Sequence, residues 1–259
     1  MTDEAPTGTA RRSFFVVIPA RYASTRLPGK PLRELNGKAL VHHVYDVGIS
    51  SGAAGVVVAT DDARIEAYCR EHGLGVAMTD QGHQSGTDRC AEVATARGWD
   101  DDAVVVNLQG DEPLVPPGYL ALAAEHAADA DLATLAAPMN SEDWHDTNRV
   151  KVVCDAAGRA LYFSRAPIPW HRDAATSPPP VAPLHHVGIY AYRVRTLARL
   201  TALPPTALER TESLEQLRAL YHGLSIRVAT VDALPGPGVD TPEDLDLVAQ
   251  RLAQRGGDA

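Results

Sequence analysis

Short, unbroken apolar runs alternate with helical patterns through the first half of the chain, and this alternation limits the folds open to it. Val56-Val57-Val58 and Val104-Val105-Val106 are runs without a polar position. A strand that is covered on both faces has this character, because neither face meets water. Strands that alternate with helices form βαβ units. We therefore expect an α/β protein with a mostly parallel sheet flanked by helices.

The same pattern sets approximate bounds for the elements. The first half should contain strands at 13–18, 55–60, 75–79, 103–108 and 132–137 and helices near 39–51, 62–72, 87–97 and 117–129. After about residue 148, the segments VKVVCD and LYFSRA indicate an inserted hairpin. The later elements should be a proline-rich loop at 176–180, the strand LHHVGIYAYR, a helix at 213–222, a strand at 225–231 and a helix from Thr241. We expect a polar tail over 1–12 and a single domain over 13–259, with the insertion at about 148–195.

Charge and composition exclude several kinds of protein. The formal net charge is −9, whereas a dedicated nucleic-acid binder needs a basic surface for its phosphate contacts. No apolar run is long enough to cross a bilayer, so we expect no membrane span. Cys69, Cys90 and Cys154 show no CxxC spacing. Such thiols are expected to be reduced and mostly packed, as in a cytoplasmic protein.

A local concentration of positive charge stands against this acidic background. The segment PARYASTRLPGKPL follows the first predicted strand and carries Arg21, Arg26 and Lys30. Guanidinium groups grip phosphate oxygens in pairs, and lysine adds a compact charge. Small residues such as Ala20 let backbone amides approach an anion closely. The segment is either a phosphate-binding loop or an ordinary solvated turn, and it is not a GxxxxGK[ST] loop because the first glycine is missing.

Two carboxylates follow strands at the sheet edge where ligands of such folds bind. Asp111 lies in the segment QGDEP, and Asp240 ends the segment PGPGVD. Either carboxylate alone could cap a turn. Together they could form a magnesium site, because Mg²⁺ prefers oxygen ligands and usually keeps waters and substrate phosphates. The sequence does not show whether the two meet.

The segment HQSGTDR leads into the predicted helix at 87–97. Ser85 or Thr87 can serve as the N-cap of that helix, which is the purely structural interpretation. The functional interpretation is a loop whose backbone and side-chain groups test the edge of a pyrimidine base. Both interpretations stay open from the residues alone.

Taken together, nine segments resemble the bacterial CMP-Kdo synthetases, the 3-deoxy-manno-octulosonate (Kdo) cytidylyltransferases. They occur in order between about residues 14 and 250: PARYASTRLPGKPL, VVVATDD, HQSGTDR, NLQGDEP, VKVV, ALYFSRAPIPW, HHVGIYAYR, LEQLR and PGVDTPEDL. The resemblance implies a GT-A-like nucleotidyltransferase fold, dependence on Mg²⁺, and a homodimer formed partly through the inserted region. It also implies a cytoplasmic enzyme of lipopolysaccharide biosynthesis, in which the anomeric hydroxyl of a sugar acid attacks the α-phosphorus of CTP and releases pyrophosphate.

The resemblance also implies roles for the matching positions. Arg21 and Lys30 would neutralise phosphate charge and Asp111 and Asp240 would hold the metal, and these four are the catalytic candidates. The nucleotide-binding candidates are Ala20, Arg21, Arg26, Lys30, Thr60, Asp61, Gln84, Ser85 and Thr87. The acceptor-binding candidates are Gln109, Arg165, His186, Tyr190, Glu215 and Gln216. Without the resemblance, Arg165 would be interpreted as a surface arginine of the hairpin and Glu215 as part of an exposed helix turn.

Three other functions are compatible with parts of the pattern. The same transfer could act on a related sugar acid, such as 8-amino-Kdo or an acid of specialised metabolism, because the segment after IPW and the pair Tyr221-His222 depart from the expected pattern. A glycosyltransferase of the same general fold would carry a DxD motif, which QGDEP lacks. A non-catalytic nucleotide-sugar sensor would be expected to have lost Lys30, Asp111 or Asp240, and all three are present.

Overall fold

The computed structural model describes residues 13–23, 26–172 and 182–257. The expected polar tail at 1–12 and the proline-rich loop at 176–180 lie outside these described residues. Within them, no helix is long and apolar enough to cross a membrane. Cys69, Cys90 and Cys154 are all free thiols, and the first two are buried, as the sequence predicts.

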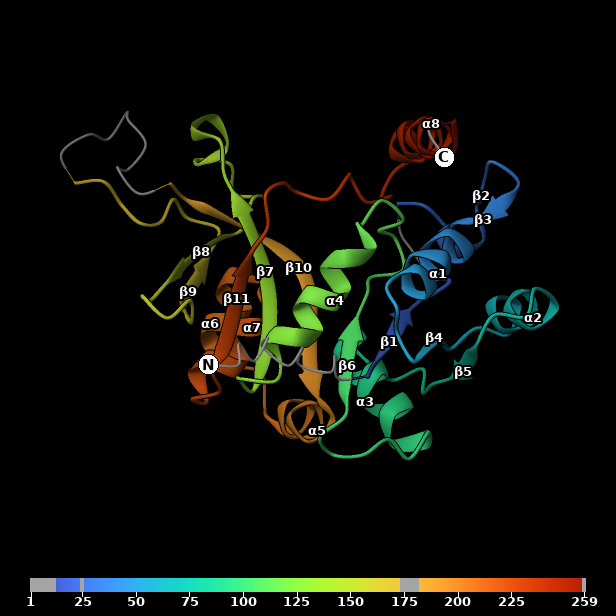
Figure 1. Cartoon of the computed structure of the whole chain (residues 1–259), viewed down its shortest axis with the longest axis horizontal. Helices are drawn as coiled ribbons and strands as arrows, with labels where there is room; N and C mark the ends of the chain where they lie inside the picture. Colours follow the sequence, from blue (N-terminus) through green and yellow to red (C-terminus); the bar gives the residue numbers. More distant parts are fainter. Residues whose placement is uncertain (1–12, 24–25, 173–181, 258–259) are drawn as a thin grey trace, which may run out of the picture.

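A mixed sheet forms the centre of the molecule (Figure 1). Along its main path the strands follow the order β11-β7-β10-β6-β1-β4-β5. Strand β10 is antiparallel to both β7 and β6, while the other neighbouring pairs on this path are parallel. The expectation of a mostly parallel sheet is confirmed. The strands are β1 (Phe14–Pro19), β4 (Gly55–Thr60), β5 (Val76–Met78), β6 (Val104–Asn107), β7 (Leu132–Pro138), β10 (Leu184–Arg193) and β11 (Ile226–Thr230).

Helices cover both faces of this sheet (Figure 1) because successive residues of its strands point to opposite sides. Val16 packs into the core under the first set of helices, and Val17 packs into the core under the second. The first set is α1 (Leu40–Ser50), α2 (Ala63–Glu71), α4 (Pro117–His126) and α8 (Pro242–Gly257). The second is α3 (Gly86–Ala96), α5 (Val194–Ala202) and α7 (Gln216–Tyr221). The unbroken apolar runs are therefore strands buried on both faces.

The predicted hairpin is present as β8 (Lys151–Cys154) and β9 (Ala160–Ser164), and β8 pairs with β10. Several elements were not predicted from the sequence. They are η1 (Lys30–Leu32), β2 (Glu34–Leu35), β3 (Lys38–Ala39), η2 (Ser141–Asp143), α5 and α6 (Ala207–Glu212).

One predicted boundary was wrong. The helix expected over 213–222 is shorter, because Ser213 takes a left-handed conformation with φ 51° and ends α6. Residue Glu215 then precedes α7, which begins at Gln216. This break places Glu215 and Gln216 at the start of a helix, where both are turned inward to line a pocket described below.

Candidate functional site

The basic segment is folded tightly after β1. Gly29 has φ 68°, in the left-handed region that favours glycine, and a Cβ there would lie 2.9 Å from the Tyr22 hydroxyl. Tyr22 is itself covered by the Arg64 guanidinium, whose central carbon lies 3.3 Å from the ring centroid. The turn leads directly into η1, which begins with Lys30. A specific backbone turn, rather than a loose basic loop, therefore presents Lys30.

Lys30 bridges Asp111 and Asp240, the two carboxylates whose proximity the sequence alone could not establish. Its Nζ lies 2.6 Å from Asp111 Oδ2 and 3.1 Å from Asp240 Oδ1. Burial acts to lower the pKa of Lys30, but the two carboxylates outweigh this effect, so the net shift is upward and the ammonium is retained. Arg26 adds an outer contact, 3.2 Å from Asp240 Oδ2. The two aspartates thus share one cation.

The loops that carry these aspartates are held together by close backbone contacts. The amide of Val239 donates a hydrogen bond of 2.8 Å to the carbonyl of Asp111. A Cβ at Gly110 would lie 2.6 Å from the carbonyl oxygen of Pro19, so only glycine lets this loop approach the end of β1. The end of β1 and the two aspartate loops consequently converge at one edge of the sheet.

These residues line a cleft of about 390 Å³. All three cations of the basic segment, both aspartates and the start of α3 contribute to its wall. The lining comprises Pro19, Ala20, Arg21, Ala23, Arg26, Lys30, Pro31, Gly86, Arg89, Gln109, Gly110, Asp111 and Asp240. A cleft with four cations in its lining suits a polyanion, although the protein as a whole is acidic.

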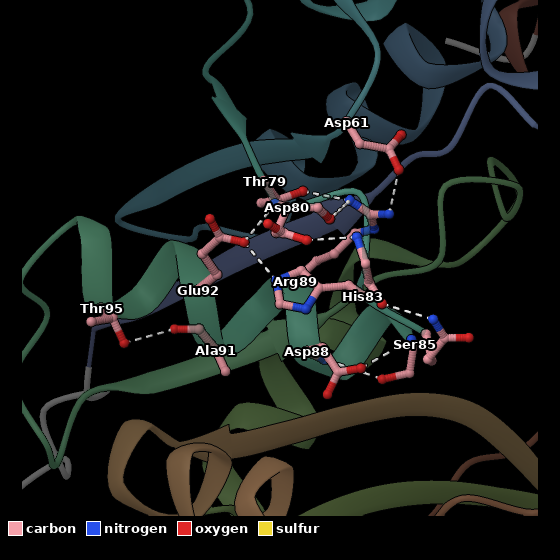
Figure 2. Close-up of polar contacts among 12 residues, drawn as sticks. Asp61, Thr79, Asp80, His83, Ser85, Asp88, Arg89, Ala91, Glu92 and Thr95 are labelled. Carbon is pink, nitrogen blue, oxygen red and sulfur yellow. Dashed lines mark hydrogen bonds and ion pairs between the residues drawn. The ribbon is translucent and has the colours of Figure 1, made fainter.

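Arg89 is the cation that sequence reasoning missed. Its side chain is 1% exposed and spans the space between β4, the end of β5 and α3 (Figure 2). Nη2 donates to Asp61 Oδ2 at 2.6 Å, and Nη1 donates to the Thr79 hydroxyl at 2.6 Å. The only signal in the sequence was a charged residue between Thr87 and Cys90, two positions of a predicted helix that are buried in the structure. Arg89 both ties these loops together and lines the cleft.

Four nucleotide-binding candidates shape the cleft without lining it. Thr60 is buried and accepts a hydrogen bond from the amide of Asp62, and Asp61 is paired with Arg89. Ser85 is the N-cap of α3 in a capping box with Asp88, as the structural interpretation predicted (Figure 2). The Gln84 amide donates to the carbonyl of Gly82. These contacts set where α3 begins and therefore where its first turn meets the cleft.

A second, smaller pocket of about 150 Å³ lies beside the cleft. Four acceptor-binding candidates line it, namely Gln109, Tyr190, Glu215 and Gln216. Thr87 also lines this pocket and hydrogen-bonds to the Glu215 carboxyl, so it lies with the acceptor group rather than with the cleft. Burial raises the pKa of Glu215, and the Thr87 contact partly opposes that rise.

Two polar groups in this smaller pocket lack a partner. The Tyr190 hydroxyl and Gln216 Nε2 are buried without a well-formed hydrogen bond. A buried polar group without a partner costs about 1–3 kcal/mol. Their position in the wall of a cavity indicates that a polar ligand supplies the missing partners.

The family of this chain follows from comparison with known proteins. A family model described as Cytidylyltransferase matches residues 15–226. A 3-deoxy-manno-octulosonate cytidylyltransferase of Halorhodospira halophila is 55% identical over 249 residues, which cover 93% of this chain and 97% of that protein. The chain belongs to the 3-deoxy-manno-octulosonate cytidylyltransferase family.

Similarity to the 3-deoxy-manno-octulosonate cytidylyltransferases extends over nearly the whole chain. The protein of that name from Xanthomonas axonopodis pv. citri is 52% identical over 257 residues, covering 95% of this chain and 99% of the relative. A solved structure of CMP:2-keto-3-deoxy-manno-octonic acid synthetase complexed with CTP matches with a TM-score of 0.86 and 42% identity. It covers 94% of this chain and 99% of that one. The nucleotidyltransferase fold is thereby confirmed.

Two acceptor-binding candidates of this cytidylyltransferase lie outside both pocket linings. The Arg165 guanidinium donates to the backbone carbonyls of Glu212 and Thr147. His186 packs against the ring of Tyr190, with 5.3 Å between ring centroids, and its Nε2 lies 3.0 Å from the Thr134 hydroxyl. Arg165 therefore stabilises the hairpin region, and His186 packs against Tyr190, which itself lines the smaller pocket.

His186 makes the stability of the protein sensitive to acid. Burial and the neighbouring His185 lower the pKa of His186 to about 3. Because this folded value lies below the unfolded value of about 6.5, protons favour the unfolded chain. The stability that the neutral ring provides is complete above about pH 6.5 and is lost as the pH falls toward the folded pKa.

We expect the wild type to lose up to about 2 kcal/mol more stability than His186→Gln between about pH 7 and pH 5. Urea unfolding at the two pH values measures this difference. The exposed His145→Gln is the matched control and should follow the wild type. An equal loss in His186→Gln and the wild type would contradict the assignment.

A third carboxyl lies against the aspartate pair. Burial, followed by repulsion from Asp111 and Asp240, raises the pKa of Glu112 to about 7, and its Oε2 is buried without a partner. No group of three or more His, Cys, Asp or Glu side chains arranged to hold a metal ion was found in the part of the chain that the structure describes. Asp111 and Asp240 are the two carboxylates at this edge that contact the Lys30 ammonium directly.

Proposed function

We propose that this chain transfers CMP from CTP to the anomeric hydroxyl of Kdo, giving CMP-Kdo and pyrophosphate. Its membership of the 3-deoxy-manno-octulosonate cytidylyltransferase family supports this reaction, as does the match to a solved synthetase complexed with CTP. The triphosphate occupies the cation-rich cleft, and the sugar acid occupies the smaller pocket.

The observation that carries the proposal is the contact between the two cavities. Gly86 and Gln109 line both of them, so the cleft and the smaller pocket adjoin. A direct transfer requires the two substrates to be bound next to each other, with the acceptor hydroxyl in line with the bond that breaks. Two separate cavities would not support a single-step transfer.

The residues of the chain act by positioning and by neutralising charge. Arg21, Arg26 and Lys30 balance the charge of the triphosphate and of the departing pyrophosphate. The unpaired groups of Tyr190 and Gln216 orient the polar acceptor. Direct attack of the hydroxyl on the α-phosphorus needs no covalent enzyme intermediate.

We further propose that the enzyme uses Mg²⁺. Asp111 and Asp240 fit this ion, because they are carboxylates that already converge on one cation at the mouth of the cleft. When bound there, Mg²⁺ would neutralise phosphate charge and polarise the phosphoryl oxygens. The two aspartates would hold the ion, and the basic segment would hold the remaining phosphate oxygens.

The cellular setting is also part of the proposal. We infer a cytoplasmic homodimer that supplies CMP-Kdo for lipopolysaccharide biosynthesis. Leu161 on β9 is 61% exposed and Trp170, beyond that strand, is 57% exposed. Large apolar side chains that are exposed in the inserted hairpin region favour this region as the surface that meets a second copy.

A pyrophosphate-release screen tests the proposed function. Each of the four nucleoside triphosphates is combined with Kdo, 8-amino-Kdo and other 2-keto sugar acids in the presence of Mg²⁺. Release should require both CTP and Kdo. CTP should be preferred over UTP, because cytosine presents an amino donor where uracil presents an acceptor, and buried hydrogen-bonding groups of the site reject the wrong base edge. Equal turnover with UTP, or a clear preference for another acid, would contradict the proposal.

The acceptor pocket can be tested through Gln216. Gln216→Leu removes the unpaired Nε2 while keeping a side chain of similar size. We expect the KM for Kdo to rise roughly tenfold and the KM for CTP to change little. The stability of the free protein should be unchanged or slightly higher, because an unsatisfied buried donor is lost. Steady-state kinetics and urea unfolding measure these effects, with the exposed Gln250→Leu on α8 as control. A rise confined to the KM for CTP would show that Gln216 contacts the nucleotide rather than the acceptor.

A further inference from the structure

We propose that Lys30 is a built-in counter-cation that occupies the divalent-metal position of the free protein and leaves it only when a triphosphate enters the cleft. Metal and nucleotide would then bind cooperatively, through one lysine that exchanges partners. This inference rests on the proposed function for the identity of the nucleotide. The exchange itself concerns only Lys30 and the two aspartates.

The geometry makes Lys30 and a metal ion competitors. The ammonium contacts Asp111 and Asp240 directly, at 2.6 Å and 3.1 Å. A Mg²⁺ ion held by the same two carboxylates would need their oxygens at about 2.0–2.1 Å. A divalent ion and an ammonium on one pair of carboxylates would also repel each other strongly.

The surroundings explain why a cation is needed there before substrates arrive. Asp111 and Asp240 bring two carboxylates to one ammonium, and without that cation the two like charges would repel each other. The Lys30 side chain is only 15% exposed, so solvent screens it poorly. Arg26 cannot replace it, because Arg26 is 66% exposed and its ion pair is with Asp240 rather than with Asp111. Lys30 is the group that offsets the repulsion in the free protein.

The Lys30 ammonium also has an alternative set of partners, namely the phosphate oxygens of a bound triphosphate. It lines the same cleft as Arg21 and Arg26, where a triphosphate would lie. Its flexible stem allows the ammonium to swing from carboxylate to phosphate oxygens without a backbone change. Once phosphate oxygens bind the Lys30 ammonium, Asp111 and Asp240 become available to the metal ion. Because coupling between two ligands is reciprocal, the metal then also strengthens nucleotide binding.

The test measures metal binding without nucleotide or acceptor. Mn²⁺ is titrated by calorimetry into the wild type and into Lys30→Met, which keeps the apolar stem but deletes the charge. We expect the variant to bind Mn²⁺ about tenfold more tightly or better, although it lacks a catalytic group. Thermal unfolding gives a second readout, in which Mg²⁺ should raise the Tm of Lys30→Met more than that of the wild type. Lys30→Gln provides the same comparison if the methionine variant folds poorly.

Two further variants make the result specific. Lys38→Met deletes a lysine that pairs with Asp46 elsewhere on the surface, and it should leave Mn²⁺ affinity at the wild-type value. Adding Asp240→Asn to Lys30→Met should abolish the gain. If Lys30→Met binds Mn²⁺ no better than the wild type, or if the gain survives Asp240→Asn, the exchange is overturned. Failure of CTP turnover would instead overturn the proposed function and leave this binding result intact.

Discussion

Replacing either Asp111 or Asp240 with asparagine should slow cytidylyl transfer by roughly a hundredfold or more. Asparagine keeps the size of the side chain but removes the charge that holds a cation. Because both aspartates contact the same cation in the structure, they act as a unit. The double variant should therefore be little slower than either single variant.

The comparison of kcat across the two single variants and the double variant measures this coupling. Asp232→Asn is a suitable control, because Asp232 is an exposed carboxylate on the same segment before Asp240. It should leave turnover unchanged. Effects of Asp111→Asn and Asp240→Asn that multiply in the double variant would show that the two aspartates serve different ions or different steps.

Replacement of Arg89 by methionine should destabilise the protein by about 3–5 kcal/mol, the range for removing one partner of a buried ion pair. Asp61 and the Thr79 hydroxyl would both lose their donor in a site where Arg89 is 1% exposed. The cleft would also lose one of its four lining cations. We expect a lower urea midpoint together with a higher KM for CTP.

Two companion variants separate the ion pair from general effects of charge. Arg97→Met removes an exposed arginine directly after α3 and should cost little. Asp61→Asn combined with Arg89→Met should recover part of the lost stability, because the uncompensated carboxylate is removed. A loss for Arg89→Met no larger than that for Arg97→Met would show that Arg89 does not connect the loops as described.

Much of the fold was predictable because its signals are local. Apolar runs such as Val56-Val57-Val58 reveal strands that are buried on both faces, and β4 contains this run. The basic segment and QGDEP could be placed at one edge of the sheet, since the carboxyl ends of parallel strands meet there. Helices α5 and α6 were not predicted, because α5 follows β10 directly without a capping side chain and the end of α6 depends on a left-handed Ser213.

The parts of the site that could not be predicted depend on contacts between distant segments. The packing of Gly110 on Pro19 and the hydrogen bond from the Val239 amide to the Asp111 carbonyl help to bring the two aspartates to one cation. Almost nothing in the sequence indicated that Arg89 belongs to the site, because a buried arginine cannot be distinguished from an exposed one by residue type alone. Thr87 was grouped with the nucleotide residues through the motif HQSGTDR, although in the structure it lines the smaller pocket together with Glu215.

The most direct test of the proposed reaction follows the oxygen atom of the attacking hydroxyl. Kdo that carries a heavy oxygen isotope in its anomeric hydroxyl is mixed with CTP, Mg²⁺ and the enzyme, and the products are examined by phosphorus NMR and mass spectrometry. We expect CMP-Kdo with the heavy oxygen in the bridge between sugar and phosphorus, together with unlabelled pyrophosphate. Label in pyrophosphate, or the absence of a CMP-sugar, would contradict direct attack of the acceptor on the α-phosphorus of CTP.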